Sequence, residues 1–229
     1  MNRWLRGLDS AVRTRRAEVL LRTSVGRRAN LSRYPYAFSP QQLWALCRAV
    51  DDAEGVAGAF AEVGVDAGAT TIYLHKHLQA RGQPARPYYA LDTFSGFTSD
   101  DIAEETRRGR SANYDEWFRV NSKRLYEQSM QDADLDNVVA IEADASAFDY
   151  EKLPELAFAL VDVDLYKPVA AAIAGCWQRL APGGIIVVDD CRPNPFWEGA
   201  LEAYLEFCGR TGLDSDIRED KLGFLSKPH

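Results

Sequence analysis

The stretch LAFALVDVDLYKPVAAAIAGCWQRLAPGGIIVVDD, residues 156–190, decides the fold class. It opens with a continuously apolar run at 156–164, which is typical of a strand covered on both faces of a sheet. An apolar helix is predicted over 168–180, the turn APGG follows at 181–184, and a second apolar strand is predicted over 185–190. A strand, a helix and another strand in this order indicate a parallel βαβ unit.

The same alternation extends over most of the chain. Further strands are predicted at 59–65, 87–94, 137–143, 214–218 and 222–226, and further helices at 40–52, 68–81, 114–131 and 197–210. The charged segment 98–111 is predicted to be an irregular insert. We therefore expect an α/β fold with a doubly wound, mostly parallel seven-stranded sheet of the Rossmann-like kind. Right-handed crossovers place the functional loops of such a sheet at the carboxyl ends of its strands.

The N-terminal segment differs from the rest of the chain in charge. Residues 1–33 contain nine arginines, Asp9 and Glu18, a local charge of +7, while the whole chain is at −7. We expect residues 1–38 to form a helical extension and residues 39–229 the main domain. The extension is predicted to act as a lid or to join a homodimer rather than to rest on an anionic membrane, because arginines interrupt its apolar stripe.

Length and composition exclude several classes of protein. The 229 residues fit one domain, and no apolar run is long enough to span a membrane or to serve as a secretory signal. Four widely spaced cysteines favour reduced thiols and a cytoplasmic location. The body after residue 33 carries a net charge of −14, which does not suggest nucleic-acid binding.

Acidic side chains follow all five predicted parallel strands. They are Glu62, Asp92, Asp144, the pair Asp162 and Asp164, and the pair Asp189 and Asp190. Acidic residues at strand ends also cap helices, which explains one or two of them. Their presence after every strand predicts a site along the carboxyl edge of the sheet.

The loop after the first strand indicates the cofactor. Glu62 is followed by Gly64, Gly68 and Thr70, so the glycines have GxxxG spacing and not the GxGxxG spacing of a dinucleotide site. An acid at the start of the loop suits a cofactor with a cationic end, such as the amino-acid part of S-adenosylmethionine. Asp92 at the end of the second strand is predicted to accept both ribose hydroxyls, although it also suits a turn cap.

The aspartates after the fourth and fifth strands predict a metal site. Burying several carboxylates side by side is costly unless a cation neutralises them, and oxygen ligands suit Mg²⁺. We expect Asp162, Asp189 and Asp190 as ligands, with Asp164 as the alternate, and Asp162 or Asp164 as catalytic base. A metal would favour ionisation of a bound hydroxyl. A solvated, metal-free set of carboxylates is the alternative.

Five motifs resemble the macrocin O-methyltransferase family: DTFSGF (92–97), ALVDVDLYKP (159–168), RLAPGG (179–184), VVDD (187–190) and GALEAYLEF (199–207). The resemblance covers about residues 55–227. It implies a small-molecule substrate that is methylated on a hydroxyl of a sugar or a polyketide glycoside. It also implies a Mg²⁺ held by the strand-four aspartate and the paired aspartates, with a carboxylate as base.

For the cofactor, the resemblance implies that Glu62 and the Gly64–Gly68 loop surround the methionine part of S-adenosylmethionine. Asp92 would bind the ribose and Asp144 would lie near the adenine. The segments YPYAFSPQQL (34–43) and CRPNPFW (191–197) depart from the family pattern and are placed beside the acceptor pocket. The alternatives are a metal-independent N- or O-methyltransferase and a nucleotide-binding oxidoreductase or inactive binding module.

Overall fold

A computed structural model describes residues 36–110, 122–193 and 198–228. The predicted N-terminal helix therefore lies outside the described residues, and the division of the chain at residue 38 stays a prediction. Within the described part, no helix is both long and apolar enough to cross a membrane. All four cysteines are buried and free of disulfides.

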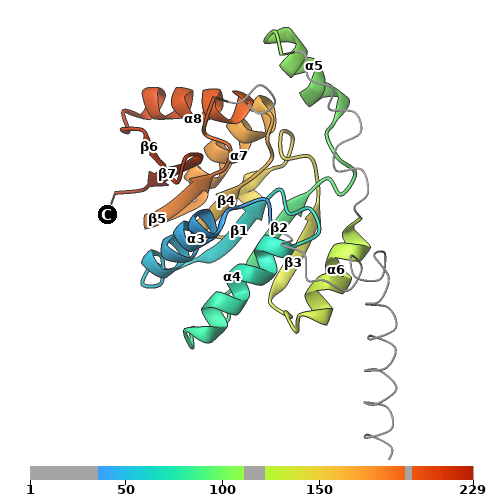
Figure 1. The fold of residues 1–229 in the computed structure, drawn as a ribbon, viewed down its shortest axis with the longest axis vertical. Helices are drawn as coiled ribbons and strands as arrows, with labels where there is room; N and C mark the ends of the chain where they lie inside the picture. The colour runs from blue at the N-terminus through green and yellow to red at the C-terminus, as the bar shows by residue number, and fades with distance from the viewer. Residues whose placement is uncertain (1–35, 111–121, 194–197, 229) are drawn as a thin grey trace, which may run out of the picture. The chain divides into compact units, whose positions relative to one another are not determined.

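A seven-stranded sheet with the order β3-β2-β1-β4-β5-β7-β6 forms the centre of the fold (Figure 1). The strands are β1 (Ala59–Val63), β2 (Tyr88–Asp92), β3 (Val138–Glu142), β4 (Leu156–Val161), β5 (Leu180–Val188), β6 (Asp216–Arg218) and β7 (Leu222–Ser226). The first five are parallel, and β7 is antiparallel to both β5 and β6. The predicted doubly wound, mostly parallel sheet is thus confirmed.

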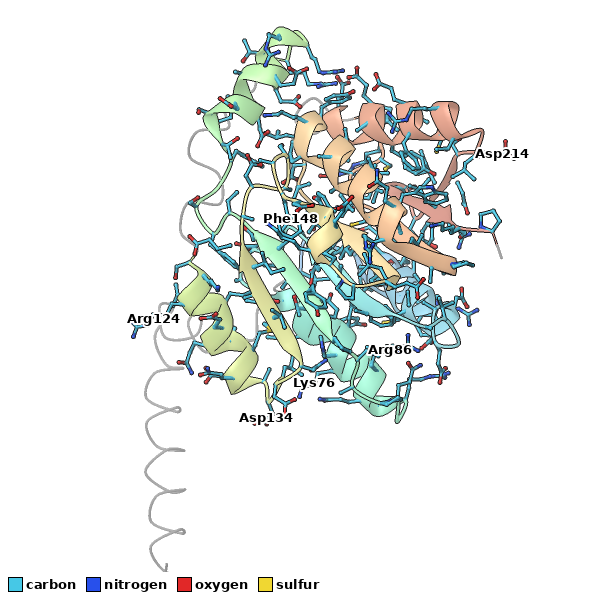
Figure 2. All side chains as sticks on the ribbon, turned by 180° about the vertical axis from the view of Figure 1, so that it is seen from behind. Lys76, Arg86, Arg124, Asp134, Phe148 and Asp214 are labelled. Atoms are coloured by element: carbon cyan, nitrogen blue, oxygen red, sulfur yellow. The ribbon has the colours of Figure 1, made fainter. Side chains whose placement is uncertain are left out.

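Two helical layers cover the sheet. On one face lie α3 (Pro40–Asp52) and α4 (Ala69–Ala80), seen in front of the sheet in Figure 1, with α6 (Lys123–Asp132) against β3. On the other face α7 (Tyr166–Arg179) packs on α8 (Glu198–Thr211), and Figure 2 shows this layer from behind. A short 3-10 helix, η1 (Tyr150–Lys152), contacts α7.

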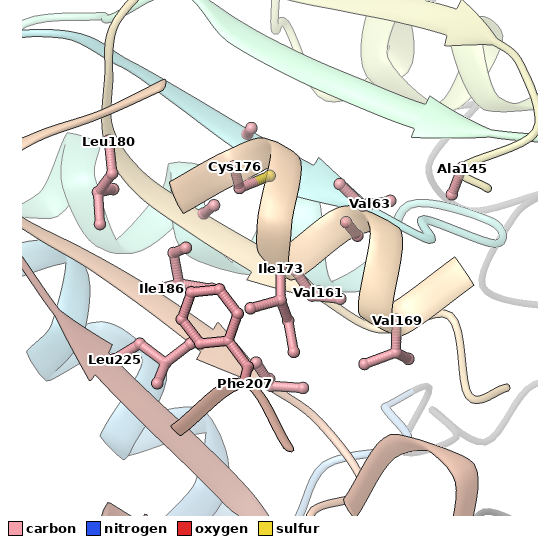
Figure 3. Packing of buried hydrophobic residues seen from close by; sticks show 14 of the residues in the cluster. Val63, Ala145, Val161, Val169, Ile173, Cys176, Leu180, Ile186, Phe207 and Leu225 are labelled. Carbon is pink, nitrogen blue, oxygen red and sulfur yellow. The ribbon is translucent and has the colours of Figure 1, made fainter. Parts of the chain in front are cut away.

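Residue alternation along the central strands explains why both faces are covered. In β1, Ala59 and Val63 belong to the core beneath α7 and α8, which is drawn in Figure 3. Phe60, next in the chain, points to the opposite face and makes an edge contact with Phe158 of β4, with ring centroids 5.5 Å apart. Every residue of β4 is buried, as its continuous apolar sequence predicts.

Local signals in the sequence set several boundaries. Ser39 caps α3 and Pro40 occupies its first turn, as predicted, and Gln42 completes a capping box by accepting the Ser39 N–H at 2.8 Å. The APGG segment is not a separate turn but a bulge inside β5, since the register shifts between Leu156 and Phe158 of the neighbouring strand.

The prediction of an irregular insert at 98–111 is wrong, because residues Ser99–Arg107 form helix α5. Thr98 caps this helix through the Asp101 N–H. Asp101 and Glu105 of this charged segment are buried and anchor the helix. The predicted helix at 114–131 is described only from Lys123, where α6 begins.

Candidate active site

The carboxyl ends of β1, β2, β4 and β5 form one edge of the sheet, and most predicted site residues lie there. Strand order reverses beside β1, which has β2 on one side and β4 on the other. In doubly wound folds ligands bind outside such a switch point. Asp144 lies farther along this edge, because β3 is the outermost parallel strand.

Only glycine fits at position 64. Its φ is +85°, and a Cβ at this position would lie 1.8 Å from the carbonyl oxygen of Asp162. Gly68, with a φ of +86°, begins α4 and leaves room for Met130 and Tyr126 of α6. The two predicted glycines therefore allow the loop after β1 to pass close to β4 and to α6. Thr70 follows in the first turn of α4.

Asp92 organises the same loop from the neighbouring strand. Its Oδ2 accepts hydrogen bonds from the backbone N–H groups of Val65 at 2.8 Å and Asp66 at 3.2 Å. Its Oδ1 accepts the Phe94 N–H at 2.7 Å. The turn-cap interpretation thus holds for the described structure, and the ribose contact stays a prediction.

Glu62 lies beneath the loop and is only 1% exposed. Its Oε2 accepts hydrogen bonds from the hydroxyls of Thr71 in α4, at 2.5 Å, and Tyr88 in β2, at 2.8 Å. Burial raises the pKa of Glu62 to about 7, although the two hydroxyl donors act in the opposite direction. The sequence prediction missed Thr71 and Tyr88. A hydroxyl one turn into the helix after the glycine loop is the signal that points to Thr71.

Asp144, predicted near the adenine, caps a turn. Its Oδ1 accepts the Ser146 N–H at 2.7 Å, and the Ser146 hydroxyl donates to Asp101 of α5, also at 2.7 Å. This connection joins the loop after β3 to α5. Among the described residues, no hydrogen bond links Asp144 to the aspartates that follow β4 and β5.

We use the name acidic cluster for Asp162, Asp164, Asp189 and Asp190. Burial and then the charges of Asp189 and Asp164 raise the pKa of Asp162 well above its usual value. Burial and the charge of Asp190 do the same for Asp164, whose side chain also hydrogen-bonds Asp190. Burial raises the pKa of Asp189 to about 6 even though Lys221 opposes the shift. The four side chains influence one another's pKa, and their predicted roles as metal ligands and base stay predictions.

Lys221 is the member of the site that sequence reasoning missed. Its Nζ lies 2.6 Å from Oδ2 of Asp189 and 3.3 Å from Oδ1 of Asp190. Since β7 runs antiparallel to β5, its start lies beside the end of β5. Burial lowers the pKa of the Lys221 ammonium, but the charges of Asp189 and Asp190 outweigh burial and the pKa lies above its usual value.

Backbone strain gathers at the same edge. Asp66, Phe94, Asp164 and Asp190 have positive φ angles of 42°, 51°, 59° and 56°, and they follow β1, β2, β4 and β5 in turn. Aspartate tolerates this region, whereas it is unusual for phenylalanine. Strained residues that cluster at strand ends are characteristic of functional sites.

Helix α5 supports the site from the side. Glu105 accepts the backbone N–H of Tyr166 at 2.6 Å, and Tyr166 begins α7 two residues after Asp164. Arg110 donates to Glu105 at 2.7 Å and also pairs with Glu202 of α8. The charged segment thus fixes the start of α7 next to the acidic cluster.

The chemistry of the acidic cluster fits a magnesium ion. All its donors are oxygens, the one ammonium pairs with only two of the four carboxylates, and Oδ1 of Asp189 is buried without a hydrogen-bond partner among the described residues. As the side chains lie, no three His, Cys, Asp or Glu residues of the described chain are gathered around a point that would hold an ion. In this arrangement Lys221 engages Asp189 and Asp190.

Comparison with known families identifies the class. The Macrocin-O-methyltransferase (TylF) family matches residues 40–223, so the chain belongs to that family and the resemblance inferred from its motifs is confirmed. A curated relative, the 8-demethyl-8-(2,3-dimethoxy-alpha-L-rhamnosyl)-tetracenomycin-C 4'-O-methyltransferase of Streptomyces olivaceus, is 26% identical over 174 residues. The matched part is 73% of this chain and spans 64% of the relative's length.

Solved structures confirm the Rossmann-like methyltransferase fold. The O-methyltransferase NovP superposes with a TM-score of 0.67 at 18% identity, over 82% of this chain and 80% of NovP. The calicheamicin methyltransferase CalS11 gives 0.66 at 19% identity, over 95% and 92%. An O-methyltransferase from Bacillus cereus, solved in complex with SAH, gives 0.53 at 19% identity, over 92% and 88%.

Proposed function

We propose that this protein is an S-adenosylmethionine-dependent O-methyltransferase that methylates a hydroxyl on a sugar or on a glycosylated natural product. Family membership supports the reaction class. The Streptomyces relative, named for methylation of a rhamnosyl tetracenomycin, supports a glycoside acceptor. The SAH in the Bacillus cereus structure supports the cofactor.

The contact between the glycine loop and the acidic cluster carries this proposal. Gly64 lies directly against the carbonyl oxygen of Asp162, and the Asp162 N–H donates to the Val63 carbonyl at 2.8 Å. A cofactor held by the loop after β1 therefore lies next to the carboxylates that would act on an acceptor. Methyl transfer requires this adjacency, because the acceptor oxygen must approach the sulfonium methyl in line.

For the cofactor, we assign the Gly64–Gly68 loop and Thr70 to the methionine part, with Glu62 setting the loop from beneath. Asp92 would receive the ribose hydroxyls, and Asp144 would border the adenine. These assignments accord with loop hydrogen bonds that leave the loop fixed before a ligand arrives. A prearranged loop reduces the entropy cost of binding.

For the reaction, we assign proton removal to Asp162, with Asp164 as the alternative base. The acceptor hydroxyl loses its proton to the carboxylate as its oxygen bonds to the methyl carbon, and the carbon–sulfur bond breaks to leave S-adenosylhomocysteine. A carboxylate is normally a weak base. Burial raises the pKa of Asp162 above its usual value, which makes its ionised carboxylate a stronger base.

Asp162, Asp189 and Asp190 are our proposed ligands for Mg²⁺. When bound, the ion would favour ionisation of the acceptor hydroxyl. A metal-independent methyltransferase is the second candidate, and the ion pair between Lys221 and Asp189 favours it. We further propose a cytoplasmic location, which free cysteines support, and a homodimer through the N-terminal helix.

The test begins with calorimetry of S-adenosylhomocysteine and NAD. We expect binding of S-adenosylhomocysteine only, and tight NAD binding without it would refute the proposed class. Methyl transfer to rhamnosides and phenols is then measured in Mg²⁺ and in excess chelator. Transfer to a rhamnoside that stops in chelator supports the full proposal, whereas transfer that continues in chelator supports the metal-independent candidate.

A further inference from the structure

The position of Lys221 is built by several contacts. Its ammonium lies 4.8 Å from the centre of the Phe38 ring. Only 6% of the residue is exposed, whereas most lysines lie at the surface. The Lys221 carbonyl accepts the Cys191 N–H at 2.8 Å, directly after the paired aspartates. Both the side chain and the backbone of Lys221 are therefore tied to the end of β5.

The segment before α3 also holds the hairpin that carries Lys221. Phe38 precedes the N-cap of α3, and Gln42 of α3 donates through Nε2 to the Glu219 carbonyl at 2.9 Å. Glu219 and Asp220, just before Lys221, have φ angles of 49° and 69°. This turn presents Lys221 to the cluster, and the segment involved is the one that departs from the family pattern.

The charges at the site explain what such a lysine does. Four carboxylates close together repel one another, and burial makes the repulsion larger. One ammonium compensates only part of this charge and leaves Oδ1 of Asp189 without a partner among the described residues. The ammonium engages Oδ2 of Asp189, and it would therefore compete with any divalent ion that bound this oxygen.

We propose that Lys221 is an internal cation that holds the acidic cluster together without metal and competes with a divalent ion for Asp189. The inference rests on the proposed metal site. As part of this proposal, the ammonium leaves Asp189 when the ion binds. Lys221 thereby lowers the affinity of the cluster for metal and stabilises the metal-free protein.

The test is calorimetric titration of the full chain with Mn²⁺, used as a probe for Mg²⁺. We expect Lys221→Met to bind Mn²⁺ at least about tenfold more tightly than the unchanged protein, since a charge-assisted contact to Asp189 is removed. Lys227→Met is the matched control: Lys227 follows the same strand at its other end, where it donates to the Trp177 and Leu180 carbonyls. It changes net charge equally and should leave the affinity unchanged.

A second measurement needs no variant. Lysines of the unchanged protein are labelled with an amine-reactive ester, with and without saturating Mn²⁺, and quantified by mass spectrometry. We expect labelling of Lys221 to rise several-fold with Mn²⁺ while labelling of Lys227 stays constant. This readout remains informative if Lys221→Met fails to fold, because it follows the ammonium itself.

The outcomes separate this inference from the proposed function. Unchanged or weaker Mn²⁺ binding by Lys221→Met, or unchanged labelling at saturation, overturns the competition while leaving the metal site standing. If neither protein binds Mn²⁺, the metal site and the competition are both overturned. Methyl transfer in chelator would then still support the methyltransferase.

Discussion

The Thr71 hydroxyl donates a 2.5 Å hydrogen bond to Oε2 of Glu62, and this contact ties helix α4 to strand β1 beneath the glycine loop. Tyr88 donates to the same oxygen from β2. Both donors are neutral, so they satisfy the carboxylate without supplying a countercharge. Burial consequently dominates and raises the pKa of Glu62 to about 7.

The first prediction follows from this raised pKa. Folded Glu62 holds its proton up to about pH 7, while an unfolded glutamate loses it near its usual value of 4.5. The folded state thus binds more protons between these values, and the stability contributed below pH 4.5 is lost as the pH rises through 7. Glu62→Gln should remove this loss. In urea denaturation at pH 8, we expect its free energy of unfolding to exceed that of the unchanged protein by about 2–3 kcal/mol.

The comparison at pH 5 is the control for that prediction. There Glu62 is protonated in the folded state, so the variant and the unchanged protein should differ little. Other acids of the site affect both proteins alike and cancel in the difference. An equal loss of stability at pH 5 and pH 8 would show that the ionised carboxylate itself holds β1 and α4 together.

A second prediction concerns Gly64. Gly64→Ala forces the loop away from Asp162, because the new Cβ would lie 1.8 Å from its carbonyl oxygen. We expect S-adenosylhomocysteine affinity to fall by about tenfold or more. The strained backbone should also lower the free energy of unfolding by about 1–2 kcal/mol. Gly82→Ala is the control, since Gly82 also has a positive φ, of +68°, but nothing within 4 Å. Equal cofactor affinity in the two variants would contradict the proposed role of the loop.

Apolar patterns in the sequence were sufficient to predict the sheet. The apolar run at 156–164 and the apolar runs of the other strands mark where the strands lie. The parallel order follows from the alternation of strands and helices. Convergence of Asp162 and Asp189 was predictable for the same reason, because parallel neighbours end at one edge. The GxxxG spacing marked the loop after β1, but the close approach of Gly64 to Asp162 depends on the neighbouring strand β4.

Features that depend on distant pairing were not predictable. Lys221 is a single charged residue in a hairpin, and only the antiparallel placement of β7 brings it to Asp189. Helix α5 was not predicted from its charged sequence, in which Glu105 is 1% exposed and accepts the N–H that begins α7. The sequence of a charged segment does not show whether its side chains are exposed to solvent or form ion pairs with residues elsewhere in the fold.

The third prediction tests the anchor formed by Glu105. Glu105→Gln leaves Arg110 next to a neutral amide while keeping an acceptor for the Tyr166 N–H. We expect the free energy of unfolding to fall by about 2–3 kcal/mol in urea denaturation, as for a broken buried ion pair. Glu104→Gln, on the same helix, removes pairs with Arg107 and Arg108 and should have a much smaller effect. Similar losses in both variants would mean that Glu105 is not the anchor.

The last prediction contrasts two aspartates of the acidic cluster in excess chelator at pH 8. Asp189→Asn removes the 2.6 Å ion pair of Lys221 and leaves a buried ammonium with Asp190, so the melting temperature should fall by about 2–6 °C. Asp164→Asn removes a charge repelled by Asp189 and Asp190, and asparagine tolerates the φ of 59°, so the melting temperature should rise by a similar amount.

Activity and cofactor binding complete the contrast between these variants. Both substitutions should lower turnover, since Asp189 is a proposed metal ligand and Asp164 an alternative base. Neither should change S-adenosylhomocysteine affinity more than about twofold, because the loops after β1 and β2 hold the cofactor. A higher melting temperature in Asp189→Asn would show that repulsion among the carboxylates outweighs the ion pair with Lys221. Full turnover in Asp164→Asn would leave Asp162 as the base.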